Sequence, residues 1–176
     1  MPMPRQHTLR DTEKMTAERL KHLDVDLQAG HALLSIYRAA NAARTYLSAT
    51  VLRPNELTWS GFLVLWVLWI WGRMETRNVA GSVGVTKATL TGVTDTLVGK
   101  GLVVRVPSTS DRRLVELELT QEGISLMNRL YPEFNRGEAR LLRDMESEDM
   151  IHLTELLRQV VTLTEAVENE DEASSM

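Results

Sequence analysis

Apolar residues recur at helical spacing along most of this chain, and capping residues, glycine and proline divide the pattern into segments. The first segment begins near Asp11 or Thr16 and ends at Pro54-Asn55, and Gly30 could interrupt it. Residues 1–10 contain two prolines and no apolar period. We therefore expect a flexible N-terminus followed by helices.

A second segment, residues 57–72, is rich in tryptophan and carries no charge. Its 16 residues fall short of the roughly 20 that span a bilayer, and Glu56 and Arg73 bound it closely. Thr58 is a suitable N-cap. The segment therefore predicts a buried core helix over residues 59–71 and no membrane association.

Two short helices are predicted next, over Thr76–Val83 and Thr86–Gly99, because Gly84-Val85 suits the left-handed turn of a helical corner. Residues 102–106 are rich in β-branched side chains, and residues 114–119 alternate between apolar and acidic ones. Turn-forming residues separate these runs, which predicts a two-stranded hairpin. A lone hairpin is marginally stable, so it must pack against the helices.

Two longer helices complete the pattern. Thr120 is a natural N-cap for the first, and Pro132 is expected to kink it. The second begins at Ser147 and carries apolar residues at alternating steps of three and four, a coiled-coil-like spacing that predicts a partner chain. The residues of this dimerisation seam are Leu153, Leu156, Val160, Leu163 and Val167.

Composition excludes several classes of function. The chain has no cysteine, which excludes disulfides and thiolate metal sites. Its four histidines are scattered without metal-site spacing, and no nucleophile or phosphate-loop motif is present. We therefore expect no enzyme activity and no cofactor. Without an export signal, the simplest location is cytoplasmic.

The formal net charge is −4, but the distribution of charge matters more than its sum. Residues 86–113 carry five basic and two acidic side chains, whereas the acidic excess lies around residues 146–149 and 165–172. A basic face on an acidic chain is consistent with binding a polyanion from one side.

The helix pair and the hairpin together form the pattern of a winged helix-turn-helix. Short and polar residues on the second helix would let it approach base edges and phosphates. Arg113 at the hairpin tip could enter a narrow minor groove, with Asp111 holding its guanidinium and Arg112 directed to a phosphate or solvent. The candidate DNA-binding residues are Thr76, Thr86, Lys87, Thr89, Thr91, Gly92, Asp111, Arg112 and Arg113.

These motifs resemble the MarR (multiple antibiotic resistance regulator) family of bacterial transcription factors over roughly residues 28–165. The resemblance rests on Val83-Gly84-Val85-Thr86-Lys87, Lys100-Gly101-Leu102-Val103, and Asp111-Arg112-Arg113 followed by Leu119-Thr120 and Gly123. It implies a mostly α fold with a small β-hairpin wing, in which N- and C-terminal dimerisation helices intertwine in a homodimer. It also implies a repressor that binds a pseudo-palindromic operator in double-stranded DNA and is released by a small aromatic anionic ligand.

The resemblance also implies a domain organisation. We expect a flexible N-terminus (1–10), N-terminal dimerisation helices (11–54), a winged helix-turn-helix DNA-binding domain (55–120), C-terminal dimerisation helices (121–168) and an acidic flexible tail (169–176).

The chain departs from the family pattern on the recognition helix. Gly92 stands where many members carry arginine, and Thr96 stands where a basic residue is common. Gly92 cannot contact a base through a side chain. Base recognition is therefore expected to shift to Lys87, Thr89, Thr91 and the wing.

The ligand site that the resemblance implies is a cleft between the dimer helices and the DNA-binding domain. Its aromatic side chains would supply an apolar slot, and an arginine would pair with a carboxylate. The alternative is that the tryptophans fill the core and the arginines are solvated. The candidate lining residues are Tyr37, Arg38, Arg44, Trp59 and Trp66.

A helical dimerisation module that binds protein rather than DNA is the alternative from another functional class. Only a DNA-binding protein would show a steep dependence of binding to duplex DNA on salt.

Overall fold

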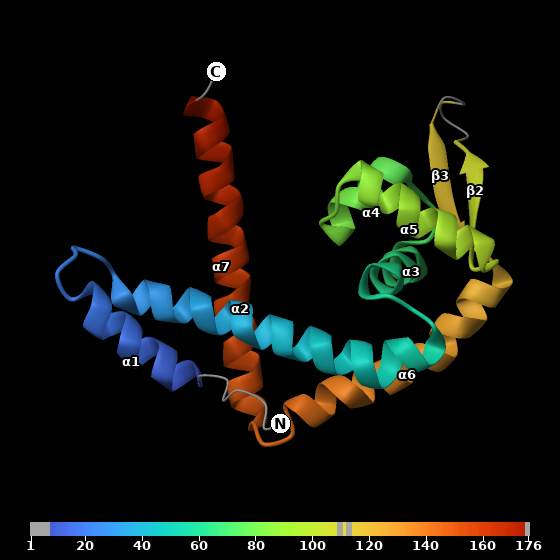
Figure 1. Cartoon of the computed structure of the whole chain (residues 1–176). Helices are drawn as coiled ribbons and strands as arrows, with labels where there is room; N and C mark the ends of the chain where they lie inside the picture. Colours follow the sequence, from blue (N-terminus) through green and yellow to red (C-terminus); the bar gives the residue numbers. More distant parts are fainter. Residues whose placement is uncertain (1–7, 109–110, 112–113, 175–176) are drawn as a thin grey trace, which may run out of the picture. The chain divides into compact units, whose positions relative to one another are not determined.

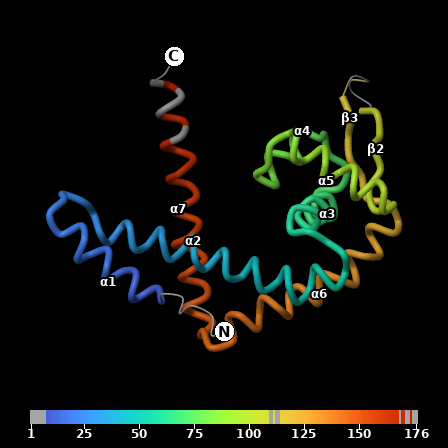
Figure 2. The backbone as a smooth tube through the Cα atoms, viewed as in Figure 1, coloured from blue at the N-terminus to red at the C-terminus, as the bar shows by residue number. Residues whose placement is uncertain are grey.

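The computed structural model describes residues 8–108, 111 and 114–174 (Figure 1). It comprises two compact units, residues 1–134 and residues 135–176. Figure 2 traces the backbone through both units. The elements are α1 (Leu9–Leu20), α2 (Leu27–Leu47), a π-helical turn (Ser48–Leu52), a 3-10 turn (Arg53–Asn55), α3 (Trp59–Trp71), β1 (Met74–Glu75), α4 (Thr76–Val83), α5 (Lys87–Gly99), β2 (Val103–Pro107), β3 (Val115–Leu119), α6 (Gln121–Leu141) and α7 (Ser147–Ser174).

The start of the helical region differs from the prediction. The helix α1 begins at Leu9 because Thr8 caps it: the Thr8 hydroxyl oxygen accepts from the Asp11 amide at 3.1 Å, and the Asp11 carboxylate accepts from the Thr8 amide at 3.0 Å. The predicted interruption at Gly30 is wrong, because Gly30 lies inside α2. The break comes earlier, before Asp26, which caps α2. A capping side chain determines where a helix starts, because it binds backbone amides that would otherwise lack a partner. A single glycine inside a helix does not end it.

The helix α3 lies at the centre of the core, as predicted. Thr58 caps it by accepting a hydrogen bond from the Gly61 amide at 3.0 Å. Its side chains at Phe62, Val64 and Leu65 are buried. The helix contacts α4, α5 and β3, so it is the element on which the helical corner and the sheet are assembled. Among the described helices, none combines the length and the apolar character that a membrane span requires.

The predicted hairpin is confirmed, because β2 and β3 pair antiparallel, and a third strand that was not predicted completes the sheet in the order β1-β3-β2. The register pairs Met74 of β1 with Leu117 of β3, and Val103 of β2 with Leu119 of β3. The strand β1 has only two residues, which is too short for any sequence period to reveal it. The third strand stabilises a hairpin that would be marginal alone.

The junction between the sheet and α6 is closely packed. Thr120 caps α6, since its hydroxyl oxygen accepts from the Gly123 amide at 3.0 Å and the hydroxyl donates to the Gly101 carbonyl at 2.6 Å. A Cβ atom on Gly123 would lie 2.2 Å from the Leu102 carbonyl oxygen. Glycine is therefore required where α6 leaves the sheet. The helix continues through Pro132.

Candidate nucleic-acid interface

The corner between α4 and α5 is a helix-turn-helix. Gly84 ends α4 with φ of 69°, in the left-handed conformation that glycine adopts most easily. The Val85 amide donates to the Ala80 carbonyl at 3.1 Å, which closes the turn. Val79 of α4 is fully buried at the corner. The predicted corner is confirmed, and α4 and α5 lie together beside the hairpin in Figure 1.

The start of α5 is stabilised by two threonines. Thr86 caps the helix, and its hydroxyl oxygen accepts from the Thr89 amide at 3.2 Å. The hydroxyls of Thr86 and Thr89 also share a hydrogen bond of 2.9 Å. Lys87 follows as the first helical residue, and its side chain is exposed. A positive side chain beside the positive end of a helix dipole forms a suitable site for a phosphate.

The two faces of α5 differ sharply in burial. Leu90, Thr94 and Leu97 are buried, and the Thr94 hydroxyl is satisfied by donating to the Leu90 carbonyl at 2.8 Å. The other face is exposed and consists of short or polar side chains. Its residues are Lys87, Ala88, Thr89, Thr91, Gly92, Asp95, Thr96 and Gly99. This face can approach a nucleic acid closely because no long apolar side chain stands on it.

An ion pair links α5 to the hairpin. An Nη atom of Arg105 in β2 donates to Asp95 Oδ1 of α5 at 2.6 Å. Both side chains are exposed at the surface, so the pair contributes little to stability, about 0–1 kcal/mol. It connects the strand β2 to the helix α5 at the surface. Sequence analysis missed it, because no local pattern relates two residues on different elements.

A second polar cluster lies near the loop end of the hairpin. Arg73 forms an ion pair with Glu116 of β3 and donates to the Pro107 carbonyl at 2.8 Å. Ser108 is buried and donates its hydroxyl to Glu116 Oε1 at 2.6 Å. The Ser108 hydroxyl and then Arg73 lower the pKa of Glu116, against an opposing effect of desolvation. The cluster joins the segment after α3 to both strands of the hairpin.

Thr76 and Asp111 take part in contacts within the protein. The Thr76 hydroxyl donates to the Val115 carbonyl at 2.8 Å and so connects α4 to β3. The Asp111 carbonyl accepts from the Leu114 amide at 2.8 Å, immediately before β3. The predicted minor-groove residue Arg113 and its neighbour Arg112, which was predicted to face a phosphate or solvent, lie outside the described residues.

Arg77 is a basic residue of this surface that sequence analysis missed. It is exposed in the first turn of α4, next to Thr76. Its position one residue into the first helix of the predicted corner is the signal that could have identified it. An arginine near a helix N-terminus on the exposed side of a helix-turn-helix can contact a phosphate.

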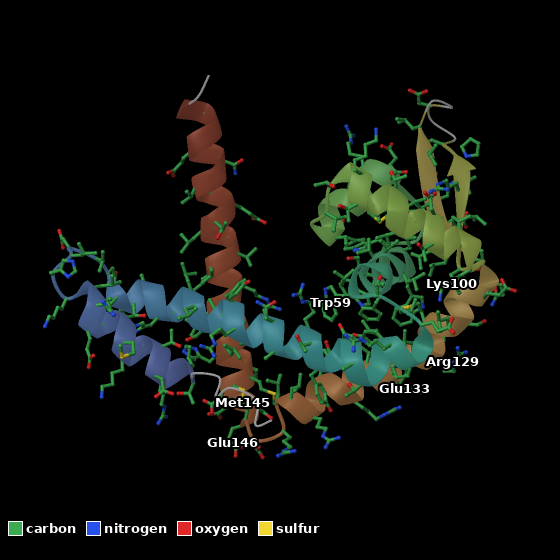
Figure 3. The ribbon with its side chains drawn as sticks, viewed as in Figure 1. Trp59, Lys100, Arg129, Glu133, Met145 and Glu146 are labelled. Atoms are coloured by element: carbon green, nitrogen blue, oxygen red, sulfur yellow. The ribbon has the colours of Figure 1, made fainter. Side chains whose placement is uncertain are left out.

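The two candidate tryptophans pack at the margin of the core. Trp59, at the start of α3, has its ring centroid 6.0 Å from that of Phe134 and 6.3 Å from that of Phe62 (Figure 3). Phe62 and Phe134 stack at 4.2 Å. Trp66 is partly buried and packs against the same core. Packing against the core therefore explains the positions of both tryptophan side chains.

The three candidates on α2 are arranged differently. Tyr37 is 68% exposed. Arg38 donates to the Thr12 hydroxyl of α1 at 3.2 Å, and Arg44 donates to the Asn41 side chain of its own helix at 2.9 Å. One arginine therefore connects α1 to α2, and the other is held along the helix surface.

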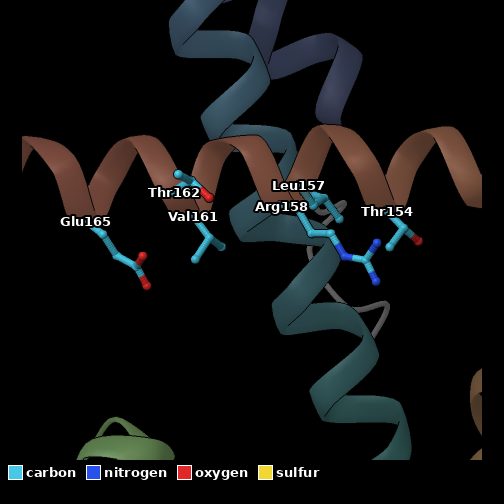
Figure 4. Close-up of a pocket in the computed structure, with 6 residues that line it drawn as sticks. All are labelled: Thr154, Leu157, Arg158, Val161, Thr162 and Glu165. Carbon is cyan, nitrogen blue, oxygen red and sulfur yellow. The ribbon is translucent and has the colours of Figure 1, made fainter.

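The described part of α7 contains no buried side chain. In the predicted seam, Leu153, Leu156, Leu163 and Val167 are exposed, and Val160 is half-buried. Figure 4 shows a shallow hollow on this helix. Its lining residues are Thr154, Leu157, Arg158, Val161, Thr162 and Glu165.

Comparison with known proteins agrees with this winged helix-turn-helix. The family model described as "MarR family" matches residues 57–115, which contain α3, the helical corner and the beginning of β3. A Bacillus subtilis protein, the uncharacterized HTH-type transcriptional regulator YwaE, is 37% identical over 155 residues, covering 86% of this chain and 91% of that protein. The chain therefore belongs to the MarR family. It is a transcriptional regulator with a DNA-binding winged helix.

Two further similar proteins bear on its role. The homoprotocatechuate degradative operon repressor of Escherichia coli is 27% identical over 130 residues, covering 74% of this chain and 87% of that protein. The crystal structure of the PcaV transcriptional regulator from Streptomyces coelicolor, in complex with its natural ligand, is 27% identical with a TM-score of 0.63. The match covers 78% of this chain and 96% of the PcaV chain.

Proposed function

We propose that this chain is a homodimeric repressor that places α5 in the major groove of an operator and the hairpin tip in the adjacent minor groove. The observation that carries this proposal is the exposed face of α5. It is short and polar, begins at Lys87, and is connected to the wing through Asp95 and Arg105. A face of this kind matches direct contact with base edges, flanked by phosphate contacts from basic residues.

The exposed seam of α7 supports a homodimer. Leu163 is 65% exposed and Val167 is 55% exposed in the single chain. A continuous row of such residues is unfavourable in water and is normally covered by a partner. A symmetric dimer would present two winged helices to two half-sites, which explains why a pseudo-palindromic operator is expected.

We propose further that a small aromatic acid or phenol releases the protein from DNA. One relative is named for an operon that degrades homoprotocatechuate, and a similar structure was determined with its natural ligand. On this chain, Arg44 is an exposed cation at the surface of α2, and Trp59 is a partly exposed aromatic ring at the start of α3. A ligand that binds the DNA-free state more tightly would weaken DNA binding by that difference in affinity.

The first experiment measures DNA binding. Genomic fragments bound by the purified protein are recovered, and the tightest is titrated against random duplex at increasing salt. We expect specific binding at least about a thousandfold tighter than binding to random duplex, with a steep salt dependence. Equal, weak binding to every duplex would contradict the proposal and favour the protein-interaction module.

The second experiment measures ligand release. A panel of benzoates, cinnamates and phenols is titrated while tryptophan fluorescence is recorded, with and without the recovered fragment. A releasing ligand should quench the fluorescence saturably, and its affinity should fall when DNA is bound. Trp59→Phe should reduce the quench, with Trp71→Phe as the matched control. No saturable quench by any compound would contradict the ligand proposal alone and leave DNA binding intact.

A further inference from the structure

The exposed face of α5 offers few hydrogen-bond donors to DNA. After Lys87, no exposed residue of this helix carries a side-chain N–H group. The exposed residues are Ala88, Thr89, Thr91, Gly92, Asp95, Thr96 and Gly99. The threonine hydroxyls are therefore the only other side-chain donors on this face, and the direction of their protons decides what the helix can recognise.

At Thr91 and Thr96 that proton is already used within the protein. The Thr91 hydroxyl donates to the Lys87 carbonyl at 2.9 Å, and the Thr96 hydroxyl donates to the Gly92 carbonyl at 3.1 Å. Either hydroxyl can be the donor in the hydrogen bond between Thr86 and Thr89, so this pair keeps one proton that is not used in it. A hydroxyl has one proton, so a threonine that donates to its own helix has none for a base. It presents a methyl group and an oxygen that can only accept.

The centre of this face permits close approach to the DNA. A Cβ atom placed on Gly92 would have no neighbouring atom within 4 Å, so the surface there is open. The Asp95 carboxylate, the one charged acceptor on this face, is paired with Arg105. The methyl groups of Ala88, Thr91 and Thr96 are thus the main groups that can contact a base edge.

The major groove distinguishes bases by their donors, acceptors and methyl groups. Guanine presents two acceptors and needs a donor from the protein, whereas thymine presents a methyl group and adenine a donor. The geometry points to recognition of thymine methyl groups in A·T base pairs by the methyl groups of Thr91 and Thr96. Their hydroxyl oxygens accept from adenine amino groups where these lie in reach. This inference rests on the proposed DNA-binding function and specifies its target.

The first test uses duplexes selected from a random library. The selected half-sites should be centred on A·T pairs where α5 binds. Each contacted thymine is then replaced by deoxyuridine, which removes only the methyl group. Affinity should fall about fourfold for each such methyl, the amount expected when burial of one methyl-sized group is lost. Half-sites centred on G·C pairs, or no effect of any deoxyuridine, would overturn the inference.

The second test changes the protein instead. In the double variant Thr91→Ser and Thr96→Ser the hydroxyls and their helix bonds remain but the methyl groups are lost, so the preference for thymidine over deoxyuridine should fall to about one. In the double variant Thr91→Val and Thr96→Val the methyl groups remain, and the preference should be retained. Thr50→Ser is the matched control, because the Thr50 hydroxyl likewise donates to the carbonyl four residues earlier, that of Tyr46, at 2.8 Å.

The outcomes separate the two proposals. If the protein binds DNA specifically but the serine variant still distinguishes thymidine from deoxyuridine as the wild type does, the inference is overturned. The proposed function is then left intact. Failure to select any specific duplex overturns the proposed function, and the inference with it. Retained specific binding, with the preference lost in the serine variant and kept in the valine variant, supports both.

Discussion

At the scale of single residues, the winged helix combines exposed positive side chains with internal pairs that hold the surface in position. Lys87 extends from the start of α5, whereas Arg105 and Arg73 are engaged with Asp95 and Glu116. We expect Lys87, which has no carboxylate partner in the described residues, to bind a DNA phosphate. We expect the paired arginines to connect elements of the protein.

Lys87→Ala should weaken binding to all duplexes alike. A phosphate contact carries no sequence information, and its loss should reduce the salt slope of log K by about one unit. Fluorescence anisotropy at four or more salt concentrations measures this slope. Lys14→Ala removes an exposed lysine from α1 and is the matched control. A loss confined to the operator, with an unchanged slope, would instead show that Lys87 contacts a base.

Glu116→Gln should alter the dependence of stability on pH. Because the pKa of Glu116 is lowered in the folded protein, its ionised form stabilises the fold at pH values above the ordinary pKa of 4.5. That contribution is lost as the pH falls through the lowered folded-state pKa. The thermal midpoint of the wild type should therefore fall more steeply than that of the variant below about pH 4.5. Parallel melting curves for the two proteins between pH 3 and 7 would contradict this role.

At the scale of elements, the starts of α3, α5 and α6 are set by local capping contacts, but the junctions between elements depend on close approach. Thr58, Thr86 and Thr120 each accept a backbone amide at the start of a helix. Gly123 then allows α6 to pass the end of the sheet.

Gly123→Ala should destabilise the protein. The added Cβ atom would lie 2.2 Å from the Leu102 carbonyl oxygen, and a backbone atom cannot move away as a flexible side chain can. Overpacking of this kind costs about 1–3 kcal/mol, more than the ~1 kcal/mol that alanine gains over glycine in a helix. Chemical denaturation measures the free energy of unfolding. Gly30→Ala, with no atom within 4 Å of its Cβ, should instead be neutral or stabilising.

At the scale of the whole molecule, the proposed function gives the apolar seam on α7 the role of joining two copies of the chain. Leu156 and Leu163 are large apolar side chains exposed in the single chain. Their burial requires another surface, and a second copy of the chain would supply one and would match the pseudo-palindromic operator that we propose.

The wild type should therefore sediment as a dimer at micromolar concentration. Leu156→Asp combined with Val160→Asp should produce unfolded or aggregated protein, because two buried carboxylates without partners would oppose association. Thr162→Asp, on the opposite side of α7 by helical spacing, should leave the dimer intact. A well-folded wild-type monomer at that concentration would contradict the predicted interface.

Local chemistry made much of this protein predictable from its sequence. The helical corner, the caps at Thr58 and Thr120, and the alternation of β3 depend on residues within a few positions of one another, so periodicity and capping patterns predict them. The motif spacing also identified the MarR family. The start of α1 and the break before α2 were missed because several capping residues competed and the propensities alone did not decide between them.

Only the tertiary structure decided the features that depend on distant residues. β1 exists because Met74 and Glu75 meet β3, and two residues have no period of their own. Two further contacts join residues on different elements. Asp95 of α5 pairs with Arg105 of β2, and Gly123 of α6 lies against the Leu102 carbonyl before β2. The sequence by itself determined which helices form and which family they belong to, because hydrogen bonding within a helix is local. The packing of those helices and strands determined which polar groups remain available to DNA, because a side chain's partners depend on the fold.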